Sequence, residues 1–147
     1  MPNHITNRLT ADGPFPQHLL DGFSLQKITP RPKILDKTEG LFNLDRALKF
    51  ETIVTDKREI ETILTAVAAK PMTGYPDWYS WAIDNWGTKW DCYDVDVIGP
   101  AHVIFNTAWA PPDIALQTLA DQTGLTLHNV WTDEGGPSGQ DTYCPSR

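Results

Sequence analysis

Hydrophobic and polar residues alternate in four separate stretches of the chain, which is the pattern of half-buried β-strands. We expect these strands at residues 4–11, 89–98, 102–110 and 125–131. Turn sequences follow two of them: Asp-Gly-Pro after the first and Gly-Pro after the second. The chain therefore holds the strands of a β-sheet in two groups, one at the N-terminus and one in the second half.

Helical spacing of apolar residues predicts four helices between and around these strands. The clearest covers residues 56–69, with a capping signal at Asp56 and Pro71 just past its end. Its inward face would be formed by Ile60, Ile63, Leu64 and Val67. We expect shorter helices at residues 17–22 and 76–85 and a further helix at 113–122. In the last of these, the inward residues would be Leu116, Leu119 and Ala120.

Three stretches carry weaker signals. Residues 23–28 alternate and run into two prolines, which predicts an extended segment at a sheet edge. Residues 33–55 show little pattern beyond a possible short strand at Ile53 and Val54. Residues 133–147 are rich in Gly, Pro and Ser and are predicted to form a flexible tail.

The order of these elements predicts the fold class. Without residues 23–84, the chain reads β-α-β-β-α-β, which is the ferredoxin-like arrangement. We therefore expect an α+β protein with an antiparallel, four-stranded sheet and helices on one face. Residues 1–132 would form one domain, with a helical insert at about residues 23–84 and the tail at 133–147.

Four segments also resemble a known family. They are residues 1–10 (Met-Pro-Asn-His-Ile-Thr-Asn-Arg-Leu-Thr), 23–32 (Phe-Ser-Leu-Gln-Lys-Ile-Thr-Pro-Arg-Pro), 78–79 with 85–91 (Trp-Tyr, then Asn-Trp-Gly-Thr-Lys-Trp-Asp), and 107–112 (Thr-Ala-Trp-Ala-Pro-Pro). In this order they resemble the small Api-like proteins of phages and plasmids.

The resemblance covers most of residues 1–136 and has two departures. Pro-Arg-Pro at residues 30–32 replaces the more usual Pro-Met-Pro, and residues 33–55 match poorly. It implies a ferredoxin-like domain, a mobile-element origin and a location in the bacterial cytoplasm. The family has no established catalytic activity to carry over, so the resemblance assigns no catalytic residue.

Charge and cysteine content narrow the function. The 147 residues have a formal net charge of −7, which disfavours direct nucleic-acid binding and suits a protein partner with a basic surface. Two cysteines provide neither a disulfide framework nor a zinc site. The sequence shows no secretion signal and no apolar run that would cross a membrane. We expect a cytoplasmic protein without a cofactor or bound metal.

The tryptophan-rich segment is the main candidate site. In one interpretation Trp86, Trp90 and Trp109 pack the insert onto the sheet, with Lys89 and Asp91 as surface charges. In the other, the indole rings and Lys89 line a pocket for a planar or anionic ligand. The sequence leaves both interpretations open.

Other candidate chemistry is weaker. Asp94 and Asp96 would share one face of a strand, with Asp91 on the other, which indicates a solvated acidic surface more than a Mg²⁺ site. His102 and His128 lie on separate strands that would have to be adjacent for the rings to meet. Phe105 and Trp109 resemble an RNA-stacking platform, but few basic residues accompany them.

These observations favour a non-enzymatic accessory protein of a phage or mobile element that binds another protein. Inhibition of a host defence system, as by an anti-CRISPR protein, is a narrower hypothesis. The alternative is a protein that binds or processes a small ligand or nucleotide near Trp86, Lys89 and Trp90.

Overall fold

The computed structural model describes residues 3–38 and 57–146 and divides the chain into two compact units. One unit comprises residues 1–30 and 84–147, and the other comprises residues 31–83. We call them the sheet unit and the helical unit and describe each by itself. Residues 23–30, which the sequence assigned to the insert, belong to the sheet unit.

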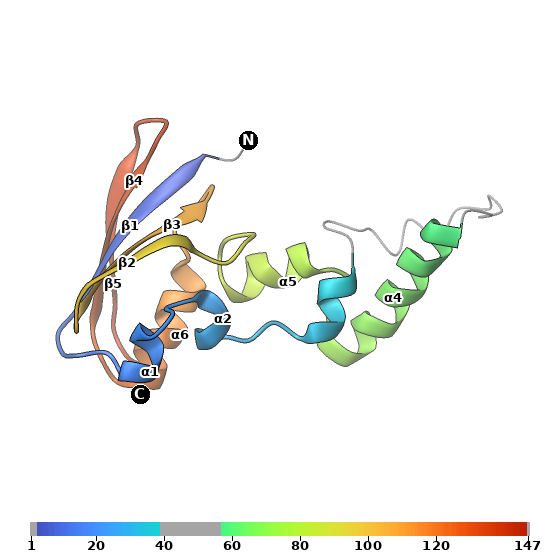
Figure 1. Cartoon of the computed structure of the whole chain (residues 1–147), viewed down its shortest axis with the longest axis horizontal. Helices are drawn as coiled ribbons and strands as arrows, with labels where there is room; N and C mark the ends of the chain where they lie inside the picture. The colour runs from blue at the N-terminus through green and yellow to red at the C-terminus, as the bar shows by residue number, and fades with distance from the viewer. Residues whose placement is uncertain (1–2, 39–56, 147) are drawn as a thin grey trace. The chain divides into compact units, whose positions relative to one another are not determined.

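The sheet unit contains one five-stranded sheet in the order β2-β3-β1-β4-β5, and every neighbouring pair is antiparallel (Figure 1). Its strands are β1 (His4–Ala11), β2 (Tyr93–Gly99), β3 (His102–Ala108), β4 (Leu127–Asp133) and β5 (Ser138–Tyr143). The first strand lies between β3 and β4, so each β-α-β crossover encloses a third strand. This is the predicted ferredoxin-like arrangement, with one more strand at the β4 edge.

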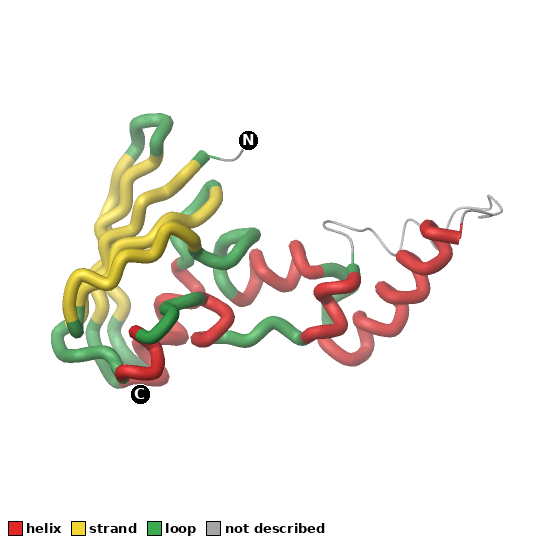
Figure 2. Tube along the Cα trace, in the orientation of Figure 1, coloured by secondary structure: helices red, strands yellow, loops and turns green. Residues whose placement is uncertain are grey.

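Three helices of the sheet unit, α1 (Gln17–Leu20), α2 (Leu25–Ile28) and α6 (Asp113–Thr123), lie on one face of the sheet (Figures 1 and 2). The core forms between them, since the alternate residues of each central strand point to this face. Its buried side chains include Ile5, Leu9, Val103, Phe105, Leu127, Leu116 and Leu119. The α+β, ferredoxin-like prediction is confirmed.

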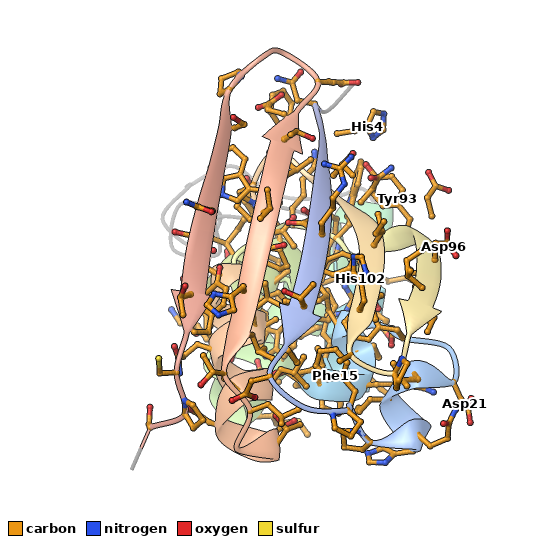
Figure 3. All side chains as sticks on the ribbon, turned by 90° about the vertical axis from the view of Figure 1, so that its left-hand side faces the viewer. His4, Phe15, Asp21, Tyr93, Asp96 and His102 are labelled. Atoms are coloured by element: carbon orange, nitrogen blue, oxygen red, sulfur yellow. The ribbon has the colours of Figure 1, made fainter. Side chains whose placement is uncertain are left out.

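The other face of the sheet is left uncovered by these helices, and Figure 3 looks onto it. Thr6, Arg8 and Thr10 of β1 alternate with the buried Ile5, Asn7 and Leu9 and lie on this face. Their β3 partners are Asn106, Ile104 and His102. The uncovered face is thus mainly polar.

The flexible tail predicted at residues 133–147 is wrong for residues 138–143, which form β5. This strand pairs with β4 from Leu127↔Tyr143 to Thr132↔Ser138. The glycines and proline that suggested a tail instead form the hairpin turn, where Gly136 has a φ of +118°. Apolar alternation did not predict β5, because this strand contains only one large apolar residue, Tyr143.

The extended edge segment predicted at residues 23–28 is also wrong, because residues 25–28 form helix α2. Ser24 caps this helix by accepting a hydrogen bond from the backbone N–H of Lys27 (3.1 Å). Leu25 and Ile28 are both buried. The alternation of Phe23, Ser24, Leu25 and Gln26 across the start of this helix resembled a strand.

The helical unit contains the 3₁₀ helix η1 (Lys33–Lys37), the helix α4 (Lys57–Thr73) and most of α5 (Trp78–Asn85). Helix α4 continues through Pro71 and ends before Gly74, which has a φ of +85°. The predicted cap at Asp56 and the strand at Ile53 and Val54 lie outside the described residues.

The inward face predicted for α4 is not the buried one. Ile60, Leu64 and Val67 are 39%, 60% and 43% exposed and Ile63 is half-buried, whereas Ala66 and Ala69 are buried. The helix contacts η1, and small alanine side chains permit a close approach. Apolar periodicity correctly predicted the helix but not which side of it is buried.

Candidate functional site

Several strand termini meet at one end of the sheet. Antiparallel pairing brings together the start of β1, the end of β3, the start of β2 and the end of β4, as the pair His4↔Ala108 shows. The tryptophan-rich segment leads into β2, and residues 109–112 leave β3 at this same end. The predicted site residues up to Asp94, together with Trp109, therefore lie near this end of the sheet unit, whereas Asp96 pairs with Ile104 farther along β3.

The first part of this segment is fixed by buried contacts. Trp86 is 1% exposed and its Nε1 donates to the carbonyl of Thr29 (3.0 Å). Gly87 has a φ of +88°, and a Cβ there would lie 3.2 Å from the backbone N of Asp113. The buried Thr88 hydroxyl donates to the carbonyl of Ala108 (2.7 Å). Trp86 is therefore a packing residue of the sheet unit, but Trp90 and Trp109, to which the same interpretation gave a packing role, are exposed.

The sequence predicted that Trp109 would continue the alternation of β3, and this prediction is wrong. Its φ is +69°, and the backbone N–H of Ala110 donates to the carbonyl of Ala108 (2.8 Å), which closes a tight γ-turn around it. The Trp109 N–H donates to Asn3 (2.9 Å), and the Thr107 hydroxyl donates to Ala110 (2.7 Å). The turn reverses the chain and leaves the Trp109 side chain 54% exposed.

Lys89 brings two exposed indoles together. Its Nζ lies 4.2 Å from the centre of the Trp90 ring and 5.7 Å from that of Trp109. Both distances are within the range of cation–π attraction. Trp90 is 40% exposed. We call Lys89, Trp90 and Trp109 the tryptophan–lysine cluster.

Asp91 is a helix cap and not a free surface charge. Its carboxylate accepts hydrogen bonds from the backbone N–H groups of Leu25 (2.7 Å) and Gln26 (3.2 Å). These two donors belong to the first turn of α2, where N–H groups have no partner within the helix. The carboxylate also accepts from the N–H of Cys92 (2.7 Å). Asp91 thus ties the tryptophan-rich segment to α2.

Cys92 is unsuited to nucleophilic catalysis. Burial, reinforced by the negative charge of Asp91, raises the pKa of its thiol from the ordinary value of 9.0 to about 12. The thiolate is the reactive form of cysteine, so the thiol is inert near neutral pH. The other cysteine, Cys144, is exposed.

Asp94 and Asp96 are exposed, but a β-bulge breaks the alternation predicted for β2. The register shifts between Tyr93 and Asp96, and Asp94 has a φ of +51°. The Asn106 amide donates to the Asp94 carboxylate (3.4 Å). Within the described ranges 3–38 and 57–146, no group of three or more His, Cys, Asp or Glu residues has the arrangement of a metal site.

The structure adds a polar cluster that the sequence did not predict. The Nδ1 of His4 is hydrogen-bonded to the Tyr93 hydroxyl, and the His4 backbone N–H donates to the Glu134 carboxylate (3.0 Å). Partial burial and the charges of Asp94 and Glu134 raise the pKa of Tyr93. Figure 3 shows His4 and Tyr93 side by side. The two contacts join residues that are separated by 89 and 130 positions along the chain, so no local sequence pattern could reveal them.

The two histidines considered as a pair lie on strands that are not adjacent. Thr10 of β1 separates them, since it is opposite His102 on one side and His128 on the other. The Nδ1 of His128 bonds the Thr142 hydroxyl instead (2.9 Å). The aromatic platform is also absent from the uncovered sheet face, because Phe105 is buried among the core residues and Trp109 lies beyond the strand.

Charge is divided unequally between the two units. Of the 19 acidic and 12 basic residues in the chain, 8 of each sign lie in residues 31–83. The remaining 11 acidic and 4 basic residues give the sheet unit the whole formal net charge of −7. The tryptophan–lysine cluster thus belongs to a strongly acidic unit.

Comparison with known families agrees with this geometry. Residues 85–146 match the family described as "Ferredoxin-like domain in Api92-like protein". This part of the chain is similar in sequence to such a domain. The match covers less than half of the chain but includes β2 to β5, α6, and both the tryptophan–lysine cluster and Glu134. The resemblance seen in the sequence is confirmed over these residues.

No curated protein and no solved structure matches the chain significantly. In the part of the chain that the structure describes, no helix is both long enough and apolar enough to cross a membrane.

Proposed function

We propose that the protein is a non-enzymatic accessory protein of a phage or mobile genetic element that acts by binding a protein with a basic surface. The observation that carries this proposal is the concentration of the entire net charge of −7 in the sheet unit. Opposite charge on a partner would accelerate association and select against acidic competitors. The mobile-element origin is proposed from the resemblance of the sequence to the Api-like proteins of phages and plasmids.

Acidic residues outnumber basic ones in the sheet unit by 11 to 4, and two of the four basic side chains contact neighbours within the unit. Lys27 Nζ donates to the carbonyls of His18 (3.2 Å) and Asp21. Lys89 lies over two indole rings. In contrast, Asp94, Asp96 and Glu134 are exposed. A basic partner would therefore meet more carboxylates than cations on this unit.

A narrower proposal is that the partner belongs to a host defence system in the bacterial cytoplasm. An acidic protein can occlude a channel that binds nucleic acid, as anti-CRISPR proteins do, because its carboxylates replace phosphates electrostatically. Plasmid-interference assays in a CRISPR-proficient host with and without this protein would test it. Unchanged interference across the systems assayed would count against this narrower role.

The direct test of protein binding is a pull-down from bacterial lysate with the tagged protein and stepwise salt elution. We expect a defined partner that elutes as ionic strength rises, since salt screens exposed charges. Asp96→Asn should lower the eluting salt concentration, whereas Glu61→Gln on the neutral helical unit should not. Capture that is indifferent to salt and to Asp96→Asn would contradict the proposal.

The second candidate is binding or processing of a small ligand or nucleotide near Trp86, Lys89 and Trp90. The placement of an ammonium over two exposed indoles favours it, because such a group can hold a planar anion. A thermal-shift screen with nucleotides would show a higher melting temperature if this function is correct. The shift should then disappear in Lys89→Met.

A further inference from the structure

The tryptophan–lysine cluster has an exposed geometry that the fold itself does not require. The hydrogen bonds of the γ-turn join main-chain atoms and the Thr107 hydroxyl, so none involves the Trp109 side chain. A glycine would adopt the φ of +69° with less strain than tryptophan. The large ring at this position is therefore explained by what it presents to solvent, not by the turn.

The position of Lys89 shows that the two indole rings attract a cation. Lys89 Nζ lies over the rings of Trp90 and Trp109 at 4.2 and 5.7 Å. The π face of an indole is electronegative and attracts cations, and both rings are about half exposed. Arginine suits such a surface better than lysine, because its guanidinium is planar and less strongly hydrated.

Carboxylates occur at the same end of the sheet. Asp94 and Glu134 are both close enough to Tyr93 to raise its pKa, and Tyr93 is the first residue of β2. Trp90 lies three residues before this strand, and Trp109 directly follows β3. An arriving basic segment would therefore meet aromatic faces and negative charge together.

We propose that Trp90 and Trp109 bind a cationic side chain, arginine above all, from a basic protein partner, and that Lys89 occupies their faces until the partner arrives. This inference rests on the proposed protein-binding function and specifies its anchor. An incoming guanidinium cannot share a ring face with the Lys89 ammonium, because like charges repel. Lys89 therefore acts as an internal competitor that returns to water on binding.

The sign of the Lys89 effect makes the proposal testable. A labelled peptide of alternating arginine and glycine serves as the probe, and matched peptides contain lysine or uncharged citrulline in place of arginine. Fluorescence anisotropy at low salt should rank the affinities as arginine, then lysine, then citrulline. Trp109→Ala and Trp90→Ala should each weaken arginine-peptide binding about three- to tenfold, and Lys89→Met should strengthen it.

Two further variants separate binding from folding. Trp109→Gly should keep or raise the melting temperature, since glycine accepts the turn, and should still lose affinity. Trp109→Phe should retain most of the affinity. Val130→Ala, on the uncovered sheet face, serves as a control that should change neither quantity.

Three outcomes would overturn the inference. Weaker binding of the arginine peptide by Lys89→Met would show that the lysine supports binding and does not compete for the ring faces. The second outcome is equal binding by the wild type and both tryptophan variants, with loss of binding only in Asp94→Asn or Glu134→Gln. This result would support binding of a basic partner through carboxylates and would reject the aromatic anchor. No binding of the arginine peptide would also reject the anchor, while the lysate pull-down would separately decide the proposed function.

Discussion

At the scale of single residues, three positive φ angles shape the site. Gly87, Asp94 and Trp109 have φ values of +88°, +51° and +69°. The left-handed region costs a residue other than glycine about 1–2 kcal/mol. Aspartate tolerates it better than most residues, and tryptophan poorly. The strain at Trp109 is offset by hydrogen bonds to Asn3 and Ala108 that fix the turn.

Gly87→Ala should destabilise the protein by about 1–3 kcal/mol. The new Cβ would be held at a positive φ, 3.2 and 3.3 Å from the backbone N atoms of Asp113 and Ile114. Urea denaturation followed by tryptophan fluorescence would measure the change. Gly74→Ala, which has a similar φ but open space around it, is a matched control that should cost less. Equal losses in both variants would show that close packing at Gly87 is unimportant.

At the scale of elements, short segments of the sheet unit depend on distant side chains. Helix α2 spans four residues, too few to be stable alone, and Asp91 supplies acceptors for its first N–H groups. Strand β5 is an edge strand whose Tyr143 hydroxyl donates to Asp113 at the start of α6. Both elements are therefore products of tertiary contacts.

Asp91→Ala should destabilise the sheet unit by about 1 kcal/mol, because the N–H groups of Leu25 and Gln26 would lose their acceptor. Asp96→Ala removes an exposed carboxylate of the same segment and should have a smaller effect. Chemical denaturation of the two variants under identical conditions would compare them. The helix-cap role fails if Asp91→Ala is as stable as Asp96→Ala.

Tyr143→Phe should lower the free energy of unfolding by about 1 kcal/mol, because the Asp113 carboxylate loses a donor. Deletion of residues 138–147 should lower it further, since β4 would lose its partner strand. Thermal unfolding by circular dichroism would measure both. A deletion variant as stable as the full chain would restore the flexible-tail prediction.

At the scale of the whole molecule, the two units differ in charge and in chemistry. The helical unit is neutral by formal charge, and the sheet unit carries −7. Among the residues that the structure describes, three groups have a pKa raised by burial and nearby acids, and all three lie in the sheet unit: Cys92, Tyr93 and Tyr143. Each of these groups is neutral in the folded protein at pH 7.

Stability should therefore decline at alkaline pH. The unfolded chain loses the Cys92 proton near pH 9.0, whereas the folded protein holds it to about pH 12. Between these values the folded state binds more protons, so the free energy of unfolding falls as pH rises. The tyrosines act in the same direction. Urea midpoints from pH 7 to 10.5 would measure the decline, and Cys92→Ala should make it shallower. Constant stability over this range would contradict the burial of these groups.

The sequence by itself determined the elements with strong periodicity. Strand β1, helix α6 with its inward Leu116 and Leu119, and the break at Gly87 follow from local spacing and backbone preference. The order of these elements along the chain predicts the ferredoxin-like fold. The elements themselves could be predicted because alternation and helical spacing are local properties of the chain. The acidity of the protein is likewise a direct property of the sequence.

Only the tertiary structure decided which residues would meet. The contacts of Asp91 with α2, of Tyr143 with Asp113 and of His4 with Tyr93 join residues from distant parts of the chain. Trp109 continues an alternating pattern in the sequence, yet the γ-turn directs it to solvent and toward Lys89. Pairing of this kind depends on sheet register and strand order, and no local pattern of side chains encodes either.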